Sequence, residues 1–349
     1  MKSGRTAVWM LLVLGTAMLF LTGCVARKGK VLETLAETDV LMTEAEPTPE
    51  PTLEPTPEPT PEPENPDFSF IWLSDTQSMI YTERLKGSYT EMIDWIISQK
   101  EDKNIIGVLH TGDIVEDAFL EKEWKEPDEG AKRLEEAGIE FIPVAGNHDL
   151  GNRHYLKWEW YLEREFVRNL PDRGYEAFEG GKGVSKVFEQ NGRKFLVVGL
   201  GFYQAFRNPA CHDWVRKQFM DHSDAVGILF LHSYIVPNGT RGIDARRLNQ
   251  YVIPDCKNLR LILCGHASGS KHLVEQNDFD GDGEPETDVH VMRFDAQGSS
   301  KKVVGFLRIL TFHTETGSLD VRSYSPVTGR DTQGNEAFED DNFTIEKLF

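Results

Sequence analysis

The chain has 349 residues, with 57 acidic against 38 basic side chains and a formal net charge of −19 at pH 7. This charge argues against nucleic acid as a partner, because a phosphate backbone is repelled by an acidic surface. The four cysteines form no Cys-x-x-Cys pair, so the sequence predicts neither a disulfide framework nor a zinc knuckle.

The N-terminus has the pattern of a secretory signal. Lys2 and Arg5 precede an apolar run over residues 7–21, and the sequence Leu-Thr-Gly-Cys follows up to Cys24. This pattern predicts a signal peptide over residues 1–23, and its end resembles the bacterial lipobox, in which the cysteine is acylated. A transmembrane anchor is the alternative, but the run is shorter than the ~20 residues that a span needs. We expect an extracytoplasmic lipoprotein anchored to the cell membrane through lipid on Cys24.

Residues 24–66 have the composition of a linker. Within them, residues 47–64 read PTPEPTLEPTPEPTPEPE. Proline favours extended polyproline II, and the repulsion between glutamates stiffens such a chain further. At ~3.1 Å per residue, the repeat would hold a domain about 55 Å from the membrane. We interpret this segment as a passive spacer.

Residues 67–349 are long enough for one large domain with a substantial core. Apolar runs predict strands, and amphipathic patterns predict helices between them: strands at 68–73, 105–109 and 140–144, and helices at 82–99 and 127–136. This β-α-β-α-β order implies parallel pairing with right-handed crossovers.

The second half of the domain begins with helical patterns and ends in strands alone. The predicted elements are a helix at 154–169, a hairpin of 184–189 and 194–200 around Asn191-Gly192, helices at 212–220 and 245–251, and strands at 226–231, 259–264, 289–294, 303–311 and 318–324. Two packed sheets with helices outside them are expected.

Side chains of the metal-ligand type follow five of these apolar strands. They are Asp75 and Gln77, Asp113 and Glu116, Asn147 and His148, His232, and finally His266 and Ser268. Because ligands bind at the carboxyl ends of strands in α/β sheets, we expect these side chains to share one rim. Each block alone is weak, since a lone Asp after a strand is usually a turn or cap residue. Their order along the chain carries the prediction.

The ordered blocks resemble those of calcineurin-like metallophosphoesterases, which are DxH, GDxxD/E, GNHD/E, a lone His, and GHxH. The resemblance covers nearly all of residues 67–349. The segments 305–312 and 321–326, together with the first block Asp-Thr-Gln, resemble a secreted bacterial subgroup. The resemblance implies an α/β fold, a four-layer α/β/β/α sandwich of two mixed sheets flanked by helices.

The resemblance also implies two divalent metal ions, with Mn, Fe, Zn or Mg as candidates. Asp113 would bridge the two ions and Asp75 would hold the first, while Asn147, His232 and His266 would complete the second site. Two cations about 3.5–4 Å apart bind phosphate oxygens and acidify a water between them. A carboxylate suits the bridging position because it has two oxygens and a negative charge.

Two further residues match the family's acid–base pair. His148 corresponds to the histidine that contacts the scissile phosphate and serves the leaving oxygen. Glu116 corresponds to the acidic residue that orients this histidine. The sequence departs from the pattern at Gln77 and Ser268, where the family has histidines that bind the first metal. Amide and hydroxyl oxygens are harder, poorer ligands than imidazole, so we expect a weak first site or one that prefers Mn, Mg or Ca.

The segment from Asp278 to Asp282 resembles a calcium loop, with acids at positions 1, 3 and 5 and a further acid, Glu286, at position 9. The bidentate glutamate expected at position 12 is replaced by Val289, so the pattern is incomplete. An acidic turn is the favoured interpretation, and calcium binding stays open as the alternative.

These observations predict a metal-dependent phosphoesterase, acting on a phosphomonoester or a phosphodiester, on the outer face of the cell membrane. The expected partners are a phosphoester substrate and the membrane, and the chain is expected to be monomeric. The alternative is a weakened surface module that binds phosphorylated polymers without cleaving them. His148 and Glu116 favour the enzyme, because a binding module needs no group that serves a leaving oxygen. A calcium-dependent adhesion protein, suggested by the Asp278–Asp282 segment, is a third hypothesis.

Overall fold

The computed structural model describes residues 67–151, 156–279, 282–297, 304–331 and 341–349. The chain divides into two compact units, residues 1–59 and 60–349, and every described residue belongs to the second. The predicted signal peptide, Cys24 and the spacer therefore lie outside the described residues. Within the described ranges, no helix combines the length and apolar character that a membrane span requires.

The first sheet has six strands in the order β13-β12-β11-β1-β2-β3. Their bounds are β1 Phe68–Leu73, β2 Ile105–His110, β3 Glu140–Pro143, β11 Leu307–His313, β12 Ser318–Tyr324 and β13 Phe343–Ile345. β1, β2 and β3 pair in parallel, while β11 pairs antiparallel with β1. The carboxyl ends of the three parallel strands consequently reach one edge of the sheet.

The second sheet has seven strands in the order β4-β5-β6-β7-β8-β10-β9. Their bounds are β4 Glu176–Phe178, β5 Gly183–Gln190, β6 Arg193–Leu200, β7 Val226–Leu231, β8 Leu259–Cys264, β9 Gly269–Asn277 and β10 Thr287–Asp295. β6, β7, β8 and β10 are parallel to one another, and the hairpins β4–β5–β6 and β9–β10 add antiparallel pairs. Both sheets are therefore mixed, as predicted.

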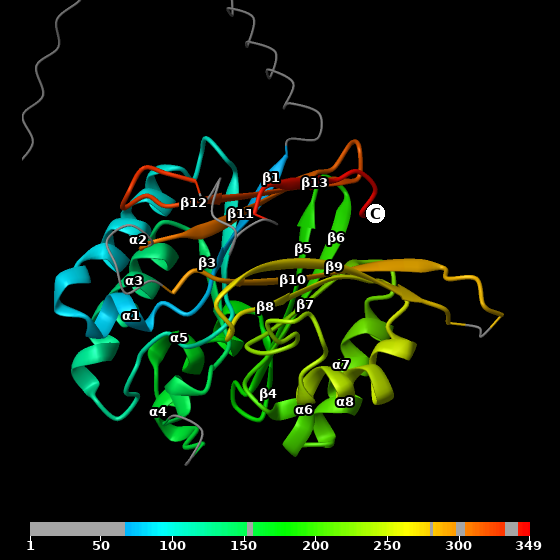
Figure 1. Ribbon diagram of the computed structural model, residues 1–349, viewed down its shortest axis with the longest axis horizontal. Helices are drawn as coiled ribbons and strands as arrows, with labels where there is room; N and C mark the ends of the chain where they lie inside the picture. The colour runs from blue at the N-terminus through cyan, green and yellow to red at the C-terminus, as the bar shows by residue number, and fades with distance from the viewer. Residues whose placement is uncertain (1–66, 152–155, 280–281, 298–303, 332–340) are drawn as a thin grey trace, which may run out of the picture. The chain divides into compact units, whose positions relative to one another are not determined.

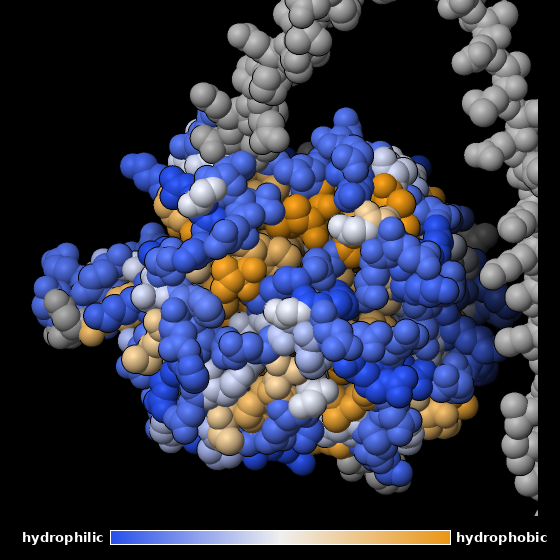
Figure 2. Space-filling view, turned by 180° about the vertical axis from the view of Figure 1, so that it is seen from behind, coloured by the Kyte–Doolittle hydropathy of each residue, from blue (hydrophilic) through white to orange (hydrophobic). Residues whose placement is uncertain are grey.

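Helices cover the outer face of each sheet. α1 Gln77–Tyr81, α2 Ser88–Ser98 and α3 Glu121–Glu136 lie beside the first sheet, and α6 Gln204–Arg207, α7 Ala210–Asp221 and α8 Ile243–Tyr251 lie beside the second (Figure 1). The β9–β10 hairpin projects beyond the sandwich, and hydrophilic residues cover its outer end (Figure 2). This arrangement confirms the four-layer α/β/β/α prediction.

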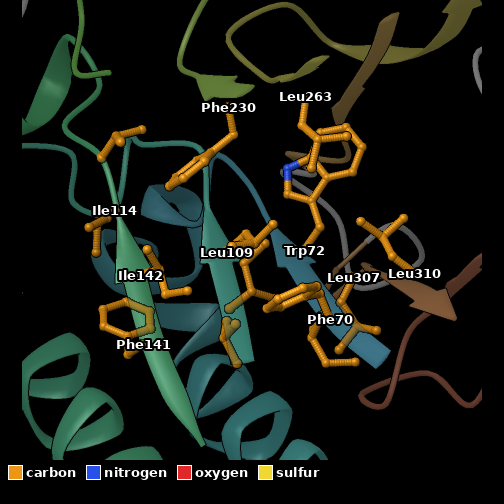
Figure 3. Packing of buried hydrophobic residues seen from close by; sticks show 14 of the residues in the cluster. Phe70, Trp72, Leu109, Ile114, Phe141, Ile142, Phe230, Leu263, Leu307 and Leu310 are labelled. Carbon is orange, nitrogen blue, oxygen red and sulfur yellow. The ribbon is translucent and has the colours of Figure 1, made fainter. Parts of the chain in front are cut away.

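The core lies between the sheets and beneath the helices. Phe70 and Trp72 on β1 face Phe230 on β7 and Leu263 on β8, and all four are buried (Figure 3). A second cluster fills the space between β6–β8 and the helices α7 and α8. Successive residues of the central strands thus pack into apolar layers on opposite faces of the sheet, which explains their continuous apolar sequences.

Some predicted elements differ from the structure. The helix predicted at 154–169 is replaced by two single-turn helices, α4 Glu159–Leu162 and α5 Glu165–Arg168, with residues 152–155 outside the described ranges. The helix predicted at 82–99 is divided at Gly87, whose φ of 85° is left-handed. α3 begins six residues before Pro127, which lies inside the helix rather than at its start. Strands β4, β9 and β13 were not predicted.

Candidate metal centre

Loops from both sheets meet at the carboxyl ends of their parallel strands. The loops after β1, β2 and β3 supply Asp75, Asp113 and Asn147, and those after β7 and β8 supply His232 and His266. Asp113, Asn147 and His266 each contact His232, and Asp75 joins them through the backbone N–H of His266. The structure therefore brings the predicted ligands of the second metal site together and places Asp75 beside them.

Four side-chain atoms of metal-ligand type surround one point. Nε2 of the fully buried His232 lies 2.9 Å from His266 Nδ1, 3.2 Å from Asn147 Oδ1 and 3.2 Å from Asp113 Oδ2. Nδ1 of His232 donates to the Thr111 carbonyl oxygen at 2.9 Å, so Nε2 is the ring nitrogen that faces the other three atoms. When the ring is protonated, Nε2 carries a single proton, which can satisfy only one of them.

The charge state of His232 reflects this convergence. Burial lowers the pKa of His232, but the negative charge of Asp113 at 3.2 Å opposes burial and raises the pKa to about 10. In the metal-free protein, a proton on Nε2 thus takes the position that suits a cation. A divalent ion at this point would satisfy all four ligand atoms, and two imidazoles suit a transition metal. The donor set fits such an ion.

Both carboxylate oxygens of Asp113 make contacts within the centre. Its Oδ1 accepts from the backbone N–H of His148 at 2.8 Å, while Oδ2 faces His232 and lies 3.5 Å from the carboxamide of Gln77. Burial would raise the pKa of Asp113, but His232 opposes burial and holds it below its ordinary value. Asp113 is therefore an anion whose two oxygens contact His232 and the backbone of His148.

Asp75 is held against the loop that supplies His266. Its carboxylate accepts from the backbone N–H of His266 at 3.0 and 3.2 Å and from the hydroxyl of Ser74. Burial raises the pKa of Asp75 well above its ordinary value, and the negative charge of Asp295 raises it further. A carboxylate in such surroundings needs a cation or a proton.

Gln77 and Ser268 stand at the two departures from the family pattern, and their positions differ. The Gln77 carboxamide is buried, with Nε2 donating to the carbonyl oxygens of Asp113 at 2.8 Å and Asp75 at 3.1 Å. This orientation, which the hydrogen-bond partners select, lets Oε1 accept from Gln297 Nε2 at 2.6 Å. Ser268 is exposed, and its carbonyl oxygen lies 3.5 Å from Arg293 Nη2. Gln77 therefore borders the centre, while Ser268 lies at its edge.

His148 and Glu116 form a pair at the mouth of the centre. His148 Nδ1 donates to the Glu116 carbonyl oxygen at 3.0 Å and lies 3.3 Å from its carboxylate, which leaves Nε2 free of both contacts. Burial raises the pKa of Glu116. The buried carboxylate of Glu123 accepts the N–H groups of Glu116 and Asp117 at 3.1 and 2.9 Å. Glu123, which sequence reasoning missed, thereby fixes the Glu116 loop.

The backbone at the centre is strained and tightly packed. Asp75, Asp113 and His266 have φ values of 52°, 54° and 68°, a left-handed conformation that costs energy for residues with a Cβ. A Cβ on Gly265 would overlap the side chains of Ser74 and Asp75. Glycine at this position therefore lets the β8 loop approach the first carboxylate closely.

Asp149 ties two of the ligand loops together. Its Oδ1 accepts the N–H groups of Ile114 and Val115 at 2.9 and 3.1 Å, and Oδ2 accepts that of Gly146 at 2.8 Å. The side chain is fully buried. The last residue of the GNHD block thus holds the Asp113 loop against the Asn147 loop, a role that the sequence alone did not predict.

The segment with the incomplete calcium-loop pattern forms a separate acidic group at the end of the β9–β10 hairpin. Asp278, Asp282 and Glu286 are exposed and place their oxygens within 4.8 Å of one another. Asp278 accepts the N–H of Gly283 at 2.8 Å and Glu286 accepts that of Phe279 at 2.7 Å, and residues 280–281 lie outside the described ranges. These hydrogen bonds are those of an acidic turn, the favoured interpretation, and calcium binding stays open as the alternative.

Comparison with known proteins identifies the family. Residues 68–267, from β1 to the His266 loop, match the calcineurin-like phosphoesterase family. The uncharacterized protein YvnB of Bacillus subtilis is 28% identical over 278 residues, which cover 77% of this chain and 21% of that protein. The chain therefore spans about a fifth of this relative's length.

Two solved structures are similar over most of the chain. The first is GAP50, the anchor in the inner membrane complex of Plasmodium, with 11% identity, a TM-score of 0.49, and coverage of 81% of this chain and 89% of that chain. The second is a predicted phosphoesterase from Streptococcus pneumoniae, with 11% identity, a TM-score of 0.35, and coverage of 81% and 99%.

Proposed function

The chain belongs to the calcineurin-like phosphoesterase family, and from that premise we propose that it is a metal-dependent hydrolase of phosphate esters. The observation that carries this proposal is the convergence of Asp113, Asn147 and His266 on Nε2 of His232 within 3.2 Å. Acceptor atoms arranged in this way repel one another unless a cation or a proton lies between them.

In the proposed mechanism, the position of each residue in this centre determines which ion it would hold. Asn147, His232, His266 and Asp113 would hold one divalent ion, and Asp75 with Asp113 would hold the other. The two ions, when bound, supply positive charge for the phosphate oxygens and lower the pKa of a water. The chain's own buried carboxylates fix where those charges sit, because their backbone hydrogen bonds leave them little freedom.

His148 is the residue that we assign to the leaving group. Its Nδ1 is engaged by Glu116, so Nε2 is the ring atom that can donate a proton or a hydrogen bond to an oxygen departing from phosphorus. The Glu116 carboxylate, 3.3 Å from Nδ1, holds the ring in this orientation. A domain that only bound phosphorylated polymers would have no use for this pair, so the pair supports hydrolysis.

We propose further that the enzyme acts outside the membrane. Lipid on Cys24 would anchor the chain there, and residues 24–66 would hold the domain away from the membrane surface. This part of the proposal is supported by the sequence pattern at the N-terminus. The Pro-Thr-Glu repeat supports it too, because an extended charged segment would separate the domain from the membrane.

The test is a screen of the purified full chain for metal and substrate. The chain is stripped with chelator, supplied with Mn²⁺, Fe²⁺, Zn²⁺, Mg²⁺, Ni²⁺ or Ca²⁺ in turn, and assayed on chromogenic phosphomonoesters and phosphodiesters. The proposal predicts turnover that needs added metal and is lost in Asp113→Asn. Turnover that is the same in wild type and Asp113→Asn, or absent with every metal and both ester classes, contradicts it.

A further inference from the structure

Besides the five strands that precede the predicted ligands, a sixth strand, β10, ends at the rim of the metal centre. β10 runs parallel to β8 with Arg293 opposite Cys264, so two residues beyond that pair place Asp295 level with His266. On its other side, Asp295 pairs with Gly269 of β9. Asp295 thus lies beside the loop that supplies His266 and Ser268, although it comes from a part of the chain that no predicted block includes.

The side chain of Asp295 is buried and hydrogen-bonded beside the predicted first metal site. It is 2% exposed, and its Oδ1 accepts the backbone N–H of Gln297 at 2.8 Å. The carboxamide of the same Gln297 donates to Gln77 Oε1 at 2.6 Å. Asp295 and Gln77 are therefore held by one residue, on the side of the centre where Asp75 lies.

The charges of this region are unbalanced. Asp75, Asp113 and Asp295 are all buried. The nearby guanidinium of Arg293 donates to the carbonyl oxygen of Val236 at 2.8 Å. Three carboxylates that repel one another in a buried space need a cation or protons among them.

We propose that Asp295 is a ligand of the first metal ion, in place of the histidine that Ser268 replaces. This inference rests on the proposed metal centre and adds a ligand to it. Asp75, Asp113 and Asp295 would each provide a carboxylate oxygen, and Gln77, whose carboxamide lies 3.5 Å from Asp113 Oδ2, would provide an amide oxygen. The Ser268 side chain then has no part in the site.

The consequence is a centre whose two halves select different metals. The first site would contain oxygen ligands alone, which suit Mn²⁺, Mg²⁺ or Ca²⁺. The second contains the imidazoles of His232 and His266, which suit Zn²⁺ or Fe²⁺. The first site would then have a full set of ligands, of a different type from those of the second site. The chain should bind one ion of each kind.

The experiment measures metal binding without substrate. The full chain is stripped, loaded with one equivalent of Zn²⁺, dialysed, and titrated with Mn²⁺ by calorimetry and by the loss of the free-ion electron paramagnetic resonance signal. Asp295→Asn is compared with wild type and with Asp288→Asn, a matched control, because Asp288 is an exposed carboxylate on the same strand. Elemental analysis gives the zinc content of each protein.

The inference predicts that all three proteins keep one Zn²⁺, while Mn²⁺ affinity falls by more than about tenfold only in Asp295→Asn. Loss of hydrogen-bond partners of metal ligands already costs about 10- to 100-fold in affinity, and loss of a ligand should cost at least as much. Asp295→Glu, which keeps a carboxylate, should bind Mn²⁺ more tightly than Asp295→Asn. Equal Mn²⁺ affinity in Asp295→Asn and Asp288→Asn overturns the inference.

Melting of the metal-free proteins separates ligation from a structural role. Removing one of three mutually repelling buried carboxylates should leave Asp295→Asn at least as stable as wild type. A lower melting temperature would make Asp295 a structural group and would also overturn the inference. Because none of these measurements uses a substrate, a failure to hydrolyse esters refutes the proposed function and leaves the result for Asp295 standing.

Discussion

Binding of a metal ion at the second site should release a proton, and its apparent affinity should therefore depend on pH. The pKa of His232 in the metal-free protein is about 10, because the charge of Asp113 outweighs the opposing effect of burial. The ring consequently stays protonated from pH 6.5 to 8.5, and an ion that binds Nε2 must displace that proton. The apparent affinity for the first equivalent of Zn²⁺ should rise about tenfold per pH unit over this range.

Calorimetric titration with Zn²⁺ in buffers of different ionisation enthalpy counts the released protons directly. About one proton per ion is expected from His232 in wild type, and fewer in His232→Asn, which has no ring to deprotonate. His290→Asn is the matched control, since His290 lies on β10 and burial lowers its pKa; it should release as many protons as wild type. An affinity that does not change between pH 6.5 and 8.5 would refute this account of His232.

Four substitutions test the other assignments. Asp113→Asn should lower turnover by orders of magnitude and reduce bound metal, because the bridge loses its charge; elemental analysis with rate measurement checks both, and unchanged metal content would remove Asp113 from the bridge. His148→Asn should lower turnover while metal content stays at the wild-type level, and the reverse pattern would disprove its assignment to the leaving group. Gly265→Ala should reduce metal retention after dialysis and destabilise the fold by about 1–3 kcal/mol, measured by urea unfolding, because the added methyl overlaps Asp75; normal retention would mean that the loop adjusts freely. Cells grown with labelled palmitate should label wild type and not Cys24→Ala, and label that persists would contradict the lipoprotein proposal.

The sequence predicted four strands with the bounds that the structure gives them. β1, β7, β8 and β12 have the predicted bounds, because each is a continuous apolar or alternating run that ends at polar or glycine residues. The predicted hairpin of β5 and β6 was also confirmed, and local sequence explains it. Asn191 and Gly192 both have positive φ, as a two-residue hairpin turn requires.

Elements that depend on distant parts of the chain were missed or misjudged. β9 Gly269–Asn277 is a polar edge strand that is held by its pairing with β10, so its own sequence shows little strand pattern. Aromatic residues at 158–166 have helical spacing, but the chain there forms two short helices around Arg164, whose backbone is extended. Packing against the first sheet and α3 outweighs local preference in this segment.

The residues of the candidate site also differ in whether the sequence alone could identify them. Asp75, Asp113, Asn147, His232 and His266 could be found because each follows a strand whose parallel neighbours are close in sequence. Asp295 also follows a predicted strand, but its place on the rim depends on β10 pairing in parallel with β8 across the β9 hairpin. Nothing local in the sequence distinguishes that pairing from an antiparallel one, which would place Asp295 at the opposite edge.

The central claim is that two ions share Asp113 at the rim where the two sheets meet. The most direct measurement is anomalous diffraction from crystals of the protein loaded with Zn²⁺ and Mn²⁺, recorded at the absorption edge of each metal. The account predicts zinc at His232 and His266, manganese at Asp75, and a separation of about 3.5–4 Å across Asp113. A single ion, or two ions with Asp113 bound to neither, would contradict it.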